Sequence, residues 1–172
     1  MKKYLPLFII LLVLAVIAVF ICLENADARI ERADKAAKAV LYENPEAMTA
    51  LAEELIRSET DEQQYQYYPA DNALCLYDGS SLYPVGQPEE HAVLDAAQFL
   101  AGDKTFDLVK SDQSSYPVAA AHCEFWKAVM DWKGNYLFIL QLIYCAEPFE
   151  ENEYAPLEEL LPNWYLYYMP CV

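Results

Sequence analysis

Cysteine offers this chain the widest range of chemistry, because a thiol can form a disulfide, bind a metal or attack a substrate. The sequence holds five: Cys22 lies in an apolar run near the N-terminus, and the others are Cys75, Cys123, Cys145 and Cys171. No two of them form a C-x-x-C pair, which excludes the spacing of zinc ribbons and of thioredoxin-type redox sites. The four cysteines after the run allow two disulfides in three connectivities, with buried free thiols as the alternative.

The apolar pattern predicts which cysteines are paired. Residues 118–130 and 136–145 are rich in apolar side chains and flank Lys133-Gly134-Asn135, which predicts a β-hairpin with Asn135 in the left-handed conformation. With Cys123 opposite Cys145, like residues meet across the hairpin: Phe125 with Ile143, Lys127 with Gln141, and Val129 with Ile139. A shift by one residue would place Lys127 opposite Leu140. We therefore predict a Cys123–Cys145 disulfide, which leaves Cys75 to pair with Cys171.

Histidines are the candidate bases and metal ligands. The two histidines are His91 and His122, and Asp95 follows His91 by one helical turn. His122 and Cys123 are neighbours on a predicted strand, so their side chains point to opposite faces and do not form a nucleophile–base pair. Two histidines are also too few for a complete catalytic zinc site.

Acidic side chains give the enzymatic alternative. Asp78, Glu124 and Asp131 lie far apart in the sequence, and a hydrolase would need such carboxylates to meet in one cleft. The acids within residues 147–153 lack the alternation and glycine of a calcium loop. The sequence contains neither a serine nucleophile elbow nor a phosphate-binding glycine loop. We expect no catalytic residue, no metal site and no cofactor.

Tyrosine is unusually frequent, with 14 in the chain. Tyr65, Tyr67 and Tyr68 are clustered in a polar stretch before Pro69, where a loop is expected. Tyrosine combines a rigid apolar ring with a polar tip and is common on binding surfaces. We predict that these three side chains form a surface that binds a protein or a glycan.

An apolar run near the N-terminus predicts attachment to a membrane. Residues 4–23 contain no charged side chain, follow Met1-Lys2-Lys3 and end before Glu24. As a helix the run is about 30 Å long, the thickness of a bilayer's hydrocarbon core. We expect residues 1–23 to be a membrane anchor or uncleaved signal. A signal peptide cleaved after Ala28 is the alternative, but signal peptides have a shorter apolar region of about 7–15 residues.

Charge bears on both orientation and partners. Basic residues between positions 29 and 38 oppose an outward orientation, whereas a basic tip followed by an apolar run is typical of export, so we expect the bulk of the chain outside the cytoplasm. The net charge is −16, and residues from Glu59 onward hold four lysines and nineteen acids. Because so acidic a domain repels phosphate, we expect no nucleic-acid partner and no peripheral binding to anionic lipids.

The periodicity of apolar residues gives the fold class. Residues 24–57 are predicted to form a helical stalk, broken at Asn44-Pro45, and then a packing helix with an apolar stripe: Met48, Leu51, Ala52, Leu55 and Ile56. Residues 58–172 are predicted to form one α+β domain, with helices packed on a mainly antiparallel sheet of four to six strands. Its predicted strands include residues 73–77, 82–85, 106–109 and 164–169, together with the hairpin.

These features favour a membrane-anchored extracytoplasmic domain that acts without catalysis, as a binding or accessory module. The alternatives are an envelope hydrolase that uses carboxylates and a structural subunit of a membrane complex. A cleft with two convergent carboxylates would indicate the hydrolase, and an exposed tyrosine-rich surface would indicate the binding module.

Overall fold

The computed structural model describes residues 10–14, 26–59, 64–84, 91–112, 120–130, 133–147 and 157–170. Within these ranges no helix is both long and apolar enough to cross a membrane. The predicted anchor, residues 4–23, lies outside them except for residues 10–14, which are helical.

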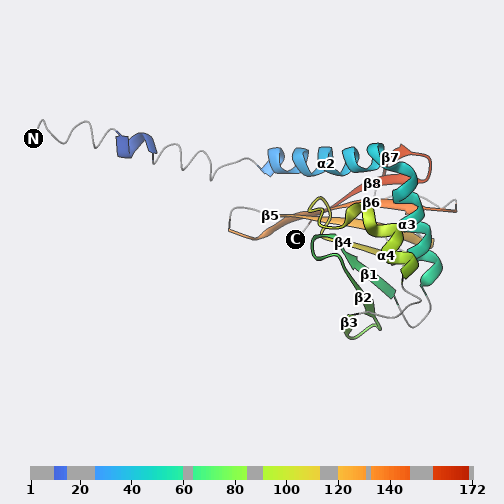
Figure 1. The fold of residues 1–172 in the computed structure, drawn as a ribbon. Helices are drawn as coiled ribbons and strands as arrows, with labels where there is room; N and C mark the ends of the chain where they lie inside the picture. Colours follow the sequence, from blue (N-terminus) through green and yellow to red (C-terminus); the bar gives the residue numbers. More distant parts are fainter. Residues whose placement is uncertain are drawn as a thin grey trace, which may run out of the picture.

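The chain has an α+β fold built on one large antiparallel sheet (Figure 1). The helices are α2 (Ala26–Glu43), α3 (Pro45–Ser58) and α4 (His91–Ala97), with 3-10 helices η1 (Pro69–Asp71) and η3 (Gln98–Leu100). The strands are β1 (Gln64–Tyr68), β2 (Ala73–Tyr77), β3 (Leu82–Pro84), β4 (Leu108–Asp112), β5 (His122–Met130), β6 (Tyr136–Cys145), β7 (Glu158–Leu161) and β8 (Trp164–Pro170). Their order is β3-β2-β1-β4-β5-β6-β8-β7, so the described residues already form eight strands and the predicted four to six are too few.

Helices α2 and α3 meet at the predicted break. The backbone N–H of Asn44 donates to the carbonyl of Val40 at 3.0 Å, and its side-chain Nδ2 donates to the same oxygen at 3.3 Å. Pro45 occupies the start of α3, where its missing N–H breaks no helical hydrogen bond. The predicted stripe is confirmed, because Met48, Leu51, Ala52 and Leu55 are the buried residues of α3.

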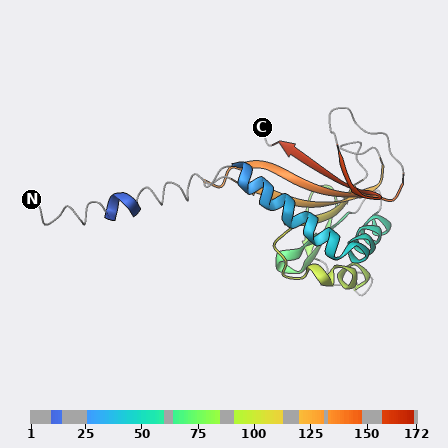
Figure 2. The same ribbon diagram turned by 90° about the horizontal axis from the view of Figure 1, so that it is seen from above.

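Helix α2 packs on the sheet rather than standing off as a stalk. It lies across β5 and β6, as the two ribbon views show (Figures 1 and 2), and its Ala37 and Leu41 are fully buried. The hydroxyl of Tyr168 on β8 donates to Asp34 Oδ1 at 2.9 Å, which ties α2 to the strand that follows β6 in the sheet. Helix α2 is therefore part of the domain, and the expected stalk is wrong for this segment.

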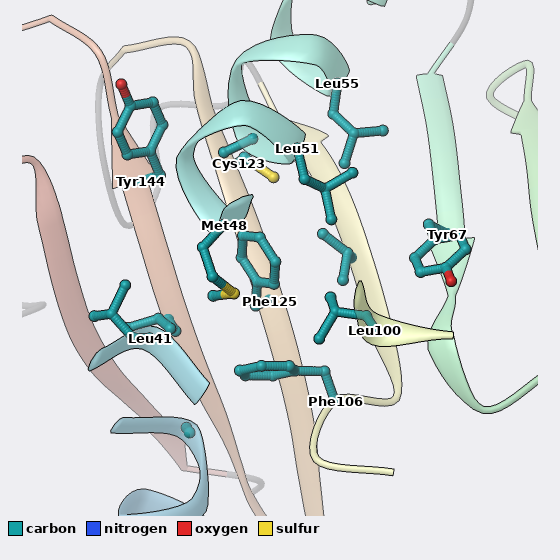
Figure 3. Packing of buried hydrophobic residues seen from close by; sticks show 14 of the residues in the cluster. Leu41, Met48, Leu51, Leu55, Tyr67, Leu100, Phe106, Cys123, Phe125 and Tyr144 are labelled. Carbon is teal, nitrogen blue, oxygen red and sulfur yellow. The ribbon is translucent and has the colours of Figure 1, made fainter. Parts of the chain in front are cut away.

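The core lies between the helices and one face of the sheet (Figure 3). Phe125 in the middle of β5 is its centre, with ring centroids 5.4 Å from Phe106 and 5.5 Å from Trp164. Leu51 and Met48 of α3 pack in the same cluster from above. Most apolar side chains of the domain therefore face the helices, and the side chains on the opposite face of the sheet are more polar.

The β5–β6 hairpin has the register that the sequence analysis rejected. Cys123 lies opposite Tyr144 and Lys127 opposite Leu140, one residue away from the predicted pairing. A bulge between Val129 and Met130 changes the register by one more residue, because Val129 pairs with Phe138 whereas Met130 pairs with Tyr136. Gly134, with φ +83°, takes the left-handed conformation predicted for Asn135. The prediction failed because it placed Lys127 and Gln141 on the same face, whereas Lys127 reaches Asp107 from the helix face.

Candidate functional site

The predicted tyrosine surface is divided between the two faces of the sheet. Residues 64–68 form strand β1 instead of a loop, so Tyr65 and Tyr67 point to one face and Tyr68 to the other. Tyr67 is fully buried, and its hydroxyl donates to Asn72 Oδ1 at 2.9 Å. Tyr65 packs against the same core. The three side chains do not form one exposed binding surface, and that prediction is wrong for Tyr67.

The predicted Cys123–Cys145 disulfide does not form in this fold. Cys75, Cys123 and Cys145 are free thiols. Cys123 points into the helix-side core and Cys145 into a cluster on the opposite face, because Cys145 pairs with His122 rather than with Cys123. Cys171 lies outside the described residues, so the structure does not place the predicted partner of Cys75.

The buried thiols of Cys123 and Cys145 should react slowly. Burial and the charge of Glu124 raise the pKa of Cys145 to about 12, and burial raises that of Cys123 well above its usual value. We expect Cys145 in the native chain to be alkylated at pH 8 roughly a thousandfold more slowly than an exposed cysteine, since only the thiolate reacts. Quantitative mass spectrometry after iodoacetamide pulses measures this, with full labelling in denaturant as the control. A Cys123–Cys145 disulfide peptide would contradict the observed register.

The face of the sheet opposite the helices carries a buried polar cluster centred on Glu124. Glu124 is 1% exposed and accepts hydrogen bonds at its two carboxylate oxygens, from Trp126 Nε1 at 2.7 Å and from His122 Nε2 at 3.2 Å. Lys110 Nζ lies 3.2 Å from Glu124 Oε2 and 2.6 Å from Asp112 Oδ2. The same ammonium lies 5.0 Å from the centre of the Trp126 ring, which adds a cation–π contact. The antiparallel pairing of β4 and β5 sets these side chains side by side.

The hydrogen-bond partners of His122 favour its charged form. Its Nδ1 donates to the carbonyl of Ala120 at 2.7 Å, while its Nε2 faces the Glu124 carboxylate. A carbonyl and a carboxylate both accept hydrogen bonds, so this arrangement favours the cationic imidazole, in which both ring nitrogens carry hydrogen. Burial by itself lowers the pKa of His122, but the hydrogen bonds to Glu124 and Ala120 and the charges of Glu124 and Asp112 offset it, so the pKa is raised.

The cluster is built to hold charges rather than to transfer protons. Two carboxylates, Asp112 and Glu124, do converge, but on Lys110 and His122, which neutralise them in pairs. A third carboxyl group, Glu59, lies near enough to feel these charges, and burial raises its pKa. Asp78 accepts hydrogen bonds from Ser80 and Ser81 in the β2–β3 turn, away from the cluster, and Asp131 lies outside the described residues. Mutual pairing of this kind favours a structural role for the cluster.

A groove lies at the junction of α3 with the β7–β8 turn and is a candidate recognition site. It has a volume of about 440 Å³ and is lined by α3 on one side and residues 161–164 on the other. Tyr144 and Trp164 form its floor, with their polar tips turned to α3: Tyr144 donates to Glu53 Oε1 at 3.0 Å, and Trp164 Nε1 donates to Thr49 Oγ1 at 3.2 Å. Burial and this hydrogen bond raise the pKa of Tyr144 to about 12, so its hydroxyl keeps the proton that it donates at neutral pH.

Glu46 gives the groove a second carboxylate. Glu46 and Glu53 are seven residues apart, two turns along α3, so they lie on one helix face about 10 Å from each other. Both line the groove and both residues are exposed. This site was not predicted from the sequence, because only the fold brings α3 beside Tyr144 and Trp164. The one sequence feature that could have indicated it is the pair of glutamates, Glu46 and Glu53, spaced two turns apart on the helix that carries the predicted apolar stripe.

Within the described residues, no group of three or more histidine, cysteine or acidic side chains is arranged to hold a metal ion. The side chain of His91 lies outside the described set, so its predicted pairing with Asp95 stays a prediction. Comparisons with protein-family models, with curated proteins and with solved structures found no match to this chain.

Proposed function

We propose that this chain is a membrane-anchored, non-enzymatic binding module whose domain lies outside the cytoplasm and holds a basic segment of a protein partner. The observation that carries the proposal is the groove between α3 and residues 161–164, with a carboxylate at each end of its α3 wall. The apolar run at residues 4–23 supplies the anchor.

The chemistry of the groove favours a cationic protein segment. Glu46 and Glu53 offer two negative charges over an apolar floor, an arrangement that suits the long stems and charged tips of lysine and arginine. Tyr144 fixes the Glu53 carboxylate in place, which reduces the entropy lost on binding. A glycan is less favoured, since the Trp164 and Tyr144 rings are only 2% and 4% exposed and offer little face for stacking.

The position of the groove suits recognition at a distance from the membrane. Helix α2 has 18 residues and is therefore about 27 Å long, and the groove lies beyond its C-terminal end, at Pro45. The anchor precedes the other end of α2. The net charge of −16 would also speed the approach of a basic partner.

Selection of peptides on the full chain tests the proposal. The chain is reconstituted in lipid nanodiscs and used to select ten-residue peptides from a random displayed library. We expect selected peptides to be rich in lysine and arginine, and their affinity to fall roughly tenfold when Glu46→Gln and Glu53→Gln are combined, as expected for two partly exposed ion pairs.

A matched variant separates the groove from the general charge. Glu31→Gln combined with Glu159→Gln removes the same charge from exposed residues outside the groove lining. We expect that variant to bind the selected peptides within about twofold of the unchanged chain. Equal weakening by both pairs, or selection of uncharged peptides, would contradict the groove as the binding site.

A further inference from the structure

The charged side chains of the α3 groove lie along one wall. Glu46, Thr49, Ala50 and Glu53 recur every three or four residues, so they share one face of α3 and line the groove together. The two glutamates are two helical turns apart, which separates their Cα atoms by about 10 Å along the helix axis. Among the described lining residues they are the only charged ones. A cationic ligand therefore meets one carboxylate at each end of this wall.

The other wall of the groove is apolar and carries one amide. Leu161 is half-buried and Pro162 is exposed, and both line the groove. Asn163 follows in the left-handed conformation, with φ +70°, and its backbone carbonyl accepts a hydrogen bond from the N–H of Cys145 at 2.9 Å. This bond anchors the turn to β6 and leaves the exposed side-chain amide of Asn163 able to donate to a ligand.

The distance between the two glutamates favours one backbone conformation for a bound segment. A polyproline II helix has three residues per turn and rises about 3.1 Å per residue, so residues three apart lie on the same side, about 9 Å from each other. A β-strand places residues of the same side about 7 or 13 Å apart. An α-helix matches the distance with residues seven apart, but short helices are marginal in water and bind grooves through apolar anchors. The floor offers little surface for such anchors, since Trp164 and Tyr144 are only 2% and 4% exposed.

We infer that the α3 groove binds a polyproline II segment that has two basic residues three positions apart and prolines between them. The inference rests on the proposed function and specifies the class of segment that the groove holds. The two basic side chains reach Glu46 and Glu53, while the intervening prolines contact Leu161 and Pro162. A polyproline II backbone has no internal hydrogen bonds, so its carbonyl groups are free to accept from the Asn163 amide. The segment has its conformation before it binds, which lowers the entropy lost on binding.

Binding of synthetic peptides to the full chain in phosphatidylcholine nanodiscs, measured by fluorescence anisotropy, tests the inference. Three labelled peptides have the same composition, with two lysines in a proline-rich background, and differ only in placing the lysines two, three or four positions apart. We expect the spacing of three to bind roughly threefold to tenfold more tightly than the others, because side chains that must bend toward their carboxylates lose more conformational freedom. Glycine in place of the prolines between the lysines should weaken this peptide roughly threefold, since a glycine backbone has more freedom to lose.

Single charge variants provide the controls. Glu46→Gln removes one of the two carboxylates and should bring the three spacings within about twofold of each other. Glu31→Gln removes the same charge from an exposed residue of α2 outside the groove lining, and should keep the preference.

The outcomes separate this inference from the proposed function. Equal binding of the three spacings would overturn the inference, as would a preference that Glu46→Gln leaves intact. Tighter binding of an alanine-rich helical peptide with lysines seven positions apart would also overturn it. In each of these cases the groove remains the binding site if Glu46→Gln combined with Glu53→Gln weakens the peptides. Absence of binding by every peptide would overturn the proposed function as well.

Discussion

Phe125→Ala should reduce the free energy of unfolding by about 3–5 kcal/mol, the largest loss expected from a single apolar substitution in this domain. Phe125 is fully buried at the centre of the sheet, with Phe106 and Trp164 packed on it from two sides. The surrounding strands are held by ladders on both sides of β5, so the cavity left by the ring would close only in part.

Urea unfolding of the full chain in mild detergent, followed by circular dichroism, measures the effect. Tyr136→Ala on the same hairpin is the matched control, because its side chain is 57% exposed and its loss should change the free energy by no more than about 0.5 kcal/mol. If Phe125→Ala were tolerated as well as Tyr136→Ala, the helices would not cover this face of the sheet as described.

Glu124→Leu should destabilise the domain by about 3–5 kcal/mol, because it leaves Lys110 and His122 buried without their shared carboxylate. The substitution also removes the acceptor of the Trp126 indole N–H. Glu158→Gln is the control, since its partner Lys38 lies 3.3 Å away at an exposed site where an ion pair contributes at most about 1 kcal/mol. A loss below about 1 kcal/mol for Glu124→Leu would show that water or rearrangement satisfies the two cations.

The same cluster predicts a pH dependence of stability. The pKa of His122 is raised in the folded state, so its protonation stabilises the fold fully below the unfolded value of about 6.5 and this stabilisation is lost as the pH rises through the folded value. The difference in thermal midpoint between the unchanged chain and His122→Asn should therefore be larger at pH 6 than at pH 9. The comparison cancels the titration of distant groups, and a difference that is constant with pH would contradict a charged His122.

The helices were predictable because their signals are local. The alanine-rich pattern of residues 26–43 and the Asn44-Pro45 break predicted both α2 and α3. The start of α3 is a local property, because the fixed φ and missing N–H of proline suit the first position of a helix. That α2 packs on the sheet was not predictable from these signals. Its buried face is mainly alanine with Leu41, a weak stripe that a solvent-exposed helix could also carry.

The strands and the site were harder to predict because they depend on distant partners. Strand β1 was predicted to be a polar loop because Gln64 and Gln66, on its face opposite the helices, are polar. It is a strand because its backbone pairs with β2 on one side and β4 on the other. The hairpin register depends on which face of the sheet Lys127 occupies. Its ammonium binds the carboxylate of Asp107, 20 residues earlier in the sequence, on the face that the helices cover. The α3 groove likewise joins residues about 100 positions apart, so no short pattern in the sequence marks it.

Photo-crosslinking from the α3 groove in intact cells tests the proposed function most directly. Ala50, an exposed residue of the groove, is replaced by benzoylphenylalanine in the full chain, and Tyr42, exposed on α2 outside the groove, is replaced in a parallel sample. We expect an adduct from position 50 and not from position 42. The adduct should join a lysine- or arginine-rich segment of a protein outside the cytoplasm, and it should be lost when Glu46→Gln and Glu53→Gln are added. An adduct that survives the two glutamine substitutions, that maps to a cytoplasmic protein, or that is no stronger than the one from position 42 would contradict the proposed function.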